Sequence, residues 1–210
     1  MKIFSSRRLV TGALALICAG SLSILPAHAA SGTRQFIENF GNKLVAIVNS
    51  PIPLQEKKSR VLPLIQQDVD IDAIGRYCLG RYWKLATPAQ QKQYLALFHE
   101  VLVNAITDKL GDYRGVSFTI GAISKSGEDD SVEAVLMRPQ QPPATMQWIV
   151  GYASGSPKVV DVIGEGASLR LTQRQDYSSY IARNGGNVEA LLNALKRQIA
   201  HHTAAATGNN

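Results

Sequence analysis

Apolar side chains recur every three or four positions in the first half of the chain, the spacing that places them on one face of a helix. The first such face runs through Phe36, Phe40, Leu44 and Ile47. The prolines that follow must end this helix, because proline cannot continue the hydrogen-bonded ladder. The helices predicted in this half cover residues 31–49, 54–66, 70–79 and 88–110.

The clearest helix start in the chain is at Thr87, Pro88 and Gln90. The threonine hydroxyl can accept a hydrogen bond from a free N–H of the first turn, and proline suits the first helical position. Glutamine three residues after the cap completes a capping box. Asp70 or Asp72 can cap the preceding helix in a similar way.

From residue 116 the hydrophobic period changes from about four to two, which predicts strands. Val116, Phe118 and Ile120 alternate with small or polar residues. The predicted strands cover residues 116–121, 132–138, 146–152 and 158–163. Their links are short and polar, and parallel pairing would need crossovers of a dozen residues or more, so an antiparallel meander is favoured. Two further helices are predicted, one from Ser168 or Thr172 and one over residues 188–200.

These elements predict an α+β fold: a four-stranded antiparallel sheet with helices from both chain ends packed over one face. Residues 30–200 have the length of a single domain that can bury a core. The space between the sheet and the helices could be a packed core or an apolar pocket. Residues 201–210 are small and polar, which predicts a disordered tail.

The N-terminus has the composition of a secretory signal. Lys2, Arg7 and Arg8 precede an apolar run over residues 9–25, and Ala27-His28-Ala29 has the small residues of a cleavage site. We therefore predict that residues 1–29 are a cleavable signal peptide and that the mature protein is exported. A retained membrane anchor is the alternative, but the apolar run is short for a span of about 20 residues.

Charge and cysteine content narrow the possible functions. The 22 basic and 16 acidic residues give a net charge of +6, and loss of the three basic residues of the leader lowers it to +3. No dense block of lysine and arginine remains, which argues against nucleic-acid binding. Cys78 is the one cysteine beyond the leader, so no disulfide can form within the mature chain and packing alone must stabilise it.

No local pattern predicts catalysis or a metal site. His99 is the one histidine in the predicted folded part, too few for a transition-metal site. Neither a Gly-x-Ser-x-Gly nucleophile elbow nor a phosphate-binding loop is present. One enzymatic hypothesis remains, an isomerase-like reaction in a pocket that uses Asp161 and Tyr82, although nothing in the sequence places these two residues together.

Two stretches are more specific than their periodicity. The first is DAIGRYCLGRYW at 72–83, which continues through ATPAQQ at 86–91 to Phe98. The second is VVDVIGEGASL at 159–169, followed by Asn-Gly-Gly at 184–186. Together they resemble the toluene-tolerance or MlaC family of periplasmic phospholipid-binding proteins, whose "LG-x-x-W-x-x-(A/T)-(T/S)-x-x-Q" and "DV-x-x-EG-x-S" runs both occur in order.

The resemblance implies a lipid carrier in the periplasm, without catalytic residues or a cofactor. Such a carrier would move a glycerophospholipid between an inner-membrane ABC transporter with an MCE-domain ring and an outer-membrane lipoprotein complex, and so maintain outer-membrane lipid asymmetry. Carriage of another lipid such as a hopanoid, the isomerase-like enzyme, and a structural module with a filled core are the alternatives.

A carrier must bury both acyl chains, because at ~0.8 kcal/mol per methylene they represent on the order of 20 kcal/mol of hydrophobic free energy. We therefore expect an apolar wall without a cluster of charged ligands. Each candidate for this wall could equally belong to a packed core. The candidates are Leu79, Tyr82, Trp83, Leu97, Val101, Met137, Met146, Trp148, Val150, Val160 and Val162.

Overall fold

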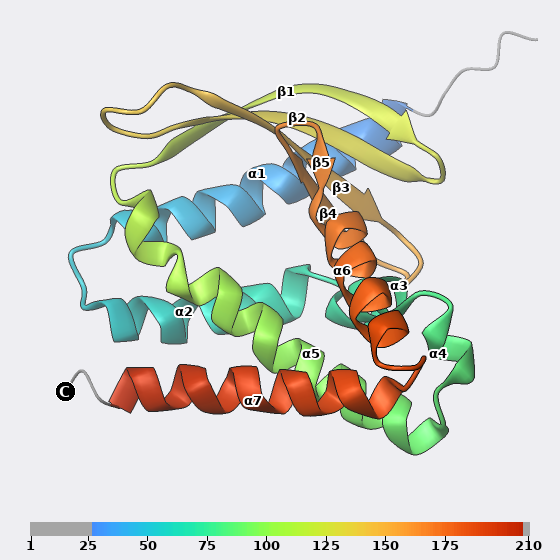
Figure 1. Ribbon diagram of the computed structural model, residues 1–210. Coiled ribbons are helices and arrows are strands. Elements are labelled where there is room, and N and C mark those ends of the chain that lie inside the picture. The colour runs from blue at the N-terminus through green and yellow to red at the C-terminus, as the bar shows by residue number, and fades with distance from the viewer. Residues whose placement is uncertain (1–26, 208–210) are drawn as a thin grey trace, which may run out of the picture.

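A computed structural model of the chain describes residues 27–207, and Figure 1 shows their arrangement. Most of the predicted leader lies outside the described residues, and the predicted cleavage point after Ala29 falls in the first turn of the first helix. The helices are α1 (Ala27–Asn49), α2 (Leu54–Asp68), α3 (Ile71–Leu79), α4 (Tyr82–Leu85), α5 (Pro88–Asp108), the 3-10 helix η1 (Leu110–Tyr113), α6 (Leu169–Arg183) and α7 (Val188–Thr207). The strands are β1 (Ser117–Ser126), β2 (Asp129–Met137), β3 (Ala144–Gly151), β4 (Lys158–Gly164) and β5 (Ala167–Ser168).

The predicted starts of α3 and α5 are confirmed. The Thr87 hydroxyl accepts a hydrogen bond of 3.2 Å from the backbone N–H of Gln90, whose side chain accepts one of 3.1 Å from the Thr87 N–H. This reciprocal pair is the capping box that begins α5. Between the two candidate caps of α3, Asp70 is the one used, because its Oδ1 accepts from the N–H of Ala73 at 3.0 Å.

The sheet is an antiparallel meander in the order β1-β2-β3-β4-β5, as predicted, but it has five strands rather than four. The additional strand β5 pairs with the end of β4, Ala167 opposite Gly164 and Ser168 opposite Ile163. Glu165 and Gly166, with φ of 52° and 79°, form the turn between them. Two residues are too few for a hydrophobic period to be recognised, which is why this strand was missed.

All the long helices lie on one side of the curved sheet, and α7 is the farthest from it (Figure 1). Helix α1 lies directly against the sheet, where Phe40 meets the Trp148 ring edge-on with 5.6 Å between ring centroids. Gly41 allows α1 to approach the sheet this closely, because a Cβ there would lie 2.3 Å from Cζ of Phe118 in β1. The predicted α+β arrangement, with helices from both chain ends over one face, is therefore confirmed.

A second core lies among the helices, below the sheet layer. Tyr94 of α5 is fully buried there, and its hydroxyl donates a 2.9 Å hydrogen bond to the carbonyl of Gly75 in α3. Leu192 of α7 and Ile181 of α6 belong to the same cluster. This core joins the N-terminal and C-terminal helices to one another. None of the helices within residues 27–207 is both long and apolar enough to cross a membrane.

Helix α7 continues to Thr207, beyond the predicted end near residue 200, so the prediction of a disordered tail from His201 differs from the structure. Two contacts explain the longer helix. His202 Nε2 lies 3.0 Å from Oδ1 of Asp108 at the end of α5, and the Thr203 hydroxyl donates to the Ile199 carbonyl at 3.1 Å. The small and polar residues of this segment predicted a disordered tail. The sequence pattern did not show the contact with Asp108, which is far away in the sequence.

Candidate functional site

An apolar cavity of about 430 Å³ lies between the sheet and the helices. Strands β3 and β4 form one wall, and helices α1, α2, α3, α5 and α6 form the others. Most of the lining is aliphatic or aromatic. These side chains are Phe40, Leu44, Ile65, Val69, Ile74, Phe98, Val101, Leu102, Ala105, Ile106, Trp148, Val159, Val160, Val162, Leu169 and Tyr177, with the thiol of Cys78 among them.

The polar part of the lining comes from β4 and α6 alone. It consists of Asp161, Arg170, Thr172, Gln173 and Asp176. On α6, Thr172 and Asp176 are exposed, and 60% of the surface of Leu169 is accessible. On α5, the lining residue Ala105 is also exposed. The mouth of the cavity therefore lies between α5 and α6, with an apolar interior behind a polar rim.

The structure places Val101, Trp148, Val160 and Val162 in the cavity wall, as predicted for a pocket. They come from α5, β3 and β4, elements that are brought together only by the fold. Whether these side chains contact a lipid stays a prediction.

The other predicted wall residues do not line the cavity. Leu79 and Tyr82 are buried in the helical core, Trp83 and Leu97 pack against that core, and Val150 is buried between the sheet and α1.

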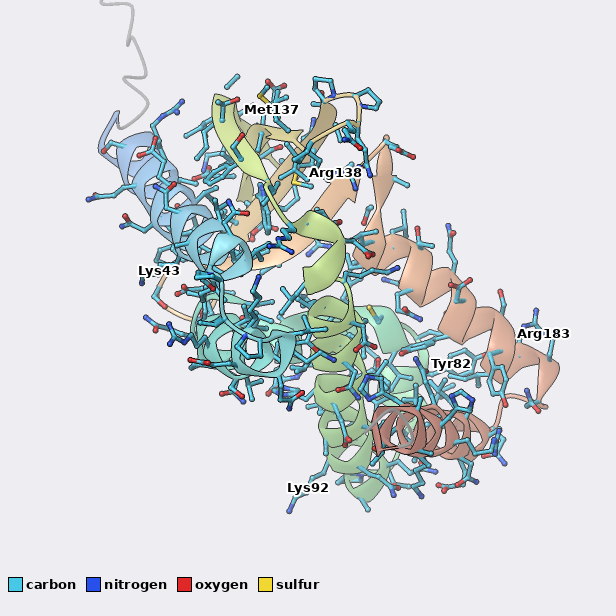
Figure 2. All side chains as sticks on the ribbon, turned by 90° about the vertical axis from the view of Figure 1, so that its left-hand side faces the viewer. Lys43, Tyr82, Lys92, Met137, Arg138 and Arg183 are labelled. Atoms are coloured by element: carbon cyan, nitrogen blue, oxygen red, sulfur yellow. The ribbon has the colours of Figure 1, made fainter. Side chains whose placement is uncertain are left out.

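The two methionines lie elsewhere as well. Met137, at the end of β2, is 50% exposed, and Met146 of β3 is half-buried away from the lining. Figure 2 shows Met137 in the sheet and Tyr82 far below it among the helices near α7. The spacing of apolar residues identified inward positions for most of these residues but not for Met137, and an inward face can meet a solid core as well as a cavity.

Several wall residues were missed by the sequence analysis. Phe98, Leu102 and Ile106 continue the same face of α5 as Val101, so the helical period could have identified them. Phe40 and Leu44 of α1 also belong to a predicted helical face. The sequence predicted that helices from both chain ends cover the sheet, but it did not indicate that α1 and α6 would line the same cavity.

A buried carboxylate joins the sheet to α6 at the rim. Asp161, 5% exposed, accepts hydrogen bonds from the Ser168 hydroxyl at 2.5 Å and from the Arg170 backbone N–H at 3.0 Å. Its Oδ1 also accepts from the Val162 N–H at 2.8 Å, and the Arg170 guanidinium lies 3.4 Å from Oδ2. The contacts with Ser168 and Arg170 hold the first turn of α6 in place.

The isomerase hypothesis receives no geometric support. Tyr82 is buried outside the cavity lining, and its hydroxyl accepts a hydrogen bond of 2.9 Å from Arg81. Asp161 is occupied by Ser168 and Arg170. Within residues 27–207 no group of three or more His, Cys, Asp or Glu side chains is placed to hold a metal ion.

Helix α6 is held to α3 by two stacked cations. The guanidinium carbons of Arg170 and Arg174 lie 4.7 and 4.9 Å from the centroid of the Tyr77 ring. Such cation–π contacts contribute about 0.5–1 kcal/mol each at partly exposed sites. Together with the Asp161 contacts, they keep α6 over the cavity without burial of large apolar side chains in its first two turns.

The interior of the cavity favours uncharged groups. Burial, and secondarily the Asp161 carboxylate, raises the pKa of the Cys78 thiol to about 12. Burial also raises the pKa of Tyr177, whose ring faces the cavity. Both groups are therefore neutral at ordinary pH, and the cavity offers an apolar ligand an uncharged environment.

Comparison with known proteins places these features in context. Residues 38–197 match the family model described as MlaC protein. The fold is similar to the structure of a phospholipid-binding protein from Ralstonia solanacearum in complex with a phospholipid, with a TM-score of 0.71 and 20% sequence identity. The similarity covers 81% of this chain and 98% of that chain, so the two share one fold over almost the whole of the Ralstonia protein.

Proposed function

Because this chain belongs to the MlaC family, we propose that it is a lipid carrier that binds the acyl chains of a glycerophospholipid in the cavity between the sheet and the helices. The cavity is the observation that carries the proposal. Its wall is almost entirely apolar, and its charged side chains lie on β4 and α6. An amphipathic ligand fits this division, with its tails inside and its head group at the rim.

The hydrophobic effect requires a closed wall of this kind. Each methylene that leaves a bilayer for water costs ~0.8 kcal/mol, so two acyl chains represent on the order of 20 kcal/mol. A carrier that exposed even part of the chains would lose the lipid back to the membrane. The head group is water-soluble and can stay at the mouth.

We expect the cavity to widen on loading. About 430 Å³ lies within the ~300–1,000 Å³ of sites for drug-sized ligands, and a phospholipid with two long chains is larger than such ligands.

The proposed location rests on the predicted leader, and the proposed partners rest on the family. Residues 1–29 would direct export, and the mature chain would then act in the periplasm. There it would move phospholipid between an inner-membrane ABC transporter with an MCE-domain ring and an outer-membrane lipoprotein complex. The cavity supports carriage in either direction, because binding is reversible and the partners determine the bias.

The decisive experiment is lipid analysis of the full-length protein after expression with export. Lipids extracted from the purified protein would be identified by mass spectrometry, and native mass spectrometry would give the number bound per protein. We expect glycerophospholipid to co-purify in a fixed ratio. Protein that is consistently empty, and that takes up no phospholipid from vesicles, would contradict the proposal, and a bound hopanoid would replace the phospholipid in it.

A further inference from the structure

Helix α6 presents charged and polar side chains in a fixed order along the cavity mouth. Arg170, Gln173 and Asp176 all belong to the lining and follow one another at intervals of three residues. Six residues of helix span about 9 Å, so a cation and an anion stand about that far apart along the axis. The helix therefore offers a guanidinium, a side-chain amide and a carboxylate, in that order, to whatever occupies the mouth.

Arg170 and Asp176 differ in the number of partners that the protein gives them. Arg170 contacts Asp161 at 3.4 Å, the Val160 carbonyl at 3.4 Å and Asp129 at 4.0 Å. The guanidinium also stacks on the Tyr77 ring, which covers one of its faces. Because its polar contacts are long and 25% of its side chain is exposed, in-plane N–H donors remain that can reach a ligand. Asp176, in contrast, forms no hydrogen bond or ion pair with any residue of the described range 27–207.

No basic side chain of α6 neutralises Asp176. Arg183 lines a neighbouring hollow together with Asp176, but it lies at the end of α6 remote from the sheet and forms no ion pair with Asp176 (Figure 2). Arg174 stacks on Tyr77 and is not part of the lining. Among the lining residues, Asp176 is thus the charge that still lacks a partner.

We propose that the mouth selects a zwitterionic phosphoethanolamine head group, with its phosphate toward Arg170 and its ammonium group at Asp176. The inference rests on the proposed function, since it concerns the head group of the lipid whose chains occupy the cavity. Phosphate, a two-carbon link and an ammonium group follow one another in this head group as Arg170, Gln173 and Asp176 do along α6. Asp161 and Ser168 act as positioning residues, because they hold the turn that carries Arg170.

Phosphatidylglycerol is the informative competitor. Its phosphate can meet Arg170 equally well, but its head group ends in neutral hydroxyls and leaves the Asp176 carboxylate without a cation. An exposed ion pair contributes about 0.4–1 kcal/mol, which is about a two- to fivefold preference for the ethanolamine lipid. The preference should shrink as salt screens the pair.

The test is a competition for loading. Delipidated full-length mature protein would be incubated with vesicles that contain equal amounts of phosphatidylethanolamine and phosphatidylglycerol with identical acyl chains, and the bound lipids would be quantified by mass spectrometry. We expect about a two- to fivefold excess of phosphatidylethanolamine in the wild type. Asp176→Asn should bring the ratio close to one, and Asp176→Lys should favour phosphatidylglycerol, with the total lipid per protein measured in parallel.

Glu128→Gln is the matched control, because Glu128 is an exposed acid in the β1–β2 turn, outside the cavity lining. It should keep the wild-type ratio. Equal loading of both lipids by the wild type, or a preference that survives Asp176→Asn, would overturn the inference while leaving the carrier function intact. Protein that loads neither lipid would overturn both.

Discussion

Asp161 and Ser168 form a hydrogen bond of 2.5 Å that joins strand β4 to the cap of helix α6. Because Asp161 is buried and also accepts the Arg170 N–H, it fixes the turn that brings α6 over the cavity. The same Ser168 hydroxyl accepts from the Leu171 N–H at 3.0 Å, so one serine serves as helix cap and as a bridge to the sheet. This pair therefore attaches the first turn of α6, which borders the mouth, to the sheet.

Asp161→Asn should weaken the attachment of α6 to β4. The amide keeps an acceptor but loses the charge that Arg170 faces and places an NH₂ group where hydrogen-bond donors now point. We expect a loss of about 1–3 kcal/mol of unfolding free energy, measured by urea denaturation, and faster exchange of bound lipid with vesicles. The control Asp112→Asn removes an exposed acid of η1 and should change neither value. Wild-type stability and exchange in Asp161→Asn would refute the positioning role.

Filling the cavity mouth should block lipid loading. Ala105 of α5 lines the cavity and is exposed, so Ala105→Trp would place an indole in the mouth without the strain of an overpacked core. Ala96 is equally exposed on the same helix but outside the lining, and nine residues place it on about the opposite side. We expect Ala105→Trp to reduce the lipid bound per protein several-fold and Ala96→Trp to leave it unchanged. Equal loading of both variants would show that the lipid lies elsewhere.

Cys78 should make stability depend on alkaline pH. Its folded pKa of about 12 lies well above the value of about 8.5 expected in the unfolded chain. Between these values the thiol ionises only when the chain unfolds, so stability falls as the pH rises, by up to ~1.4 kcal/mol per pH unit from this group. Cys78→Ala should show a shallower fall in denaturation curves from pH 8.5 upward, which separates the thiol from the tyrosines. An identical slope in the variant would contradict burial of the thiol.

The same burial should protect Cys78 from alkylation. At neutral pH a maleimide should label the native protein far more slowly than the urea-unfolded chain, because the folded thiol is neutral and inaccessible. Rapid labelling of native protein would indicate that the cavity opens often.

Gly41→Ala should separate α1 from the sheet. A Cβ at this position would lie 2.3 Å from the Phe118 ring, and both residues are packed between two layers. We expect a destabilisation of about 1–3 kcal/mol, partly restored by Phe118→Leu in the double variant. Gly32→Ala is the matched control on the same helix, since nothing lies within 4 Å of a Cβ there, and it should be neutral or stabilising by about 0.5–1 kcal/mol. Equal effects of the two substitutions would contradict the tight contact.

Local sequence signals predicted the secondary structure well where they were strong. The capping box at Thr87 and Gln90, the helical face of α5 and the alternating period of β1 all depend on contacts within a few residues. The two-residue strand β5 and the end of α7 were not predicted. Strand β5 is too short to show a hydrophobic period, and the end of α7 is held by Asp108, a partner distant in sequence.

The amino-acid sequence by itself determined which faces of the elements are apolar, where most of them begin, and that the strands form an antiparallel meander. Burial of an apolar face is favourable against any neighbour, so the pattern does not say which neighbour it meets. Only the tertiary structure decided that Val101 and Val162 face an open cavity while Leu79 and Val150 face solid core. It also decided that Asp161 holds α6 at the mouth, because hydrogen-bond geometry and the space left between packed elements arise from the complete fold.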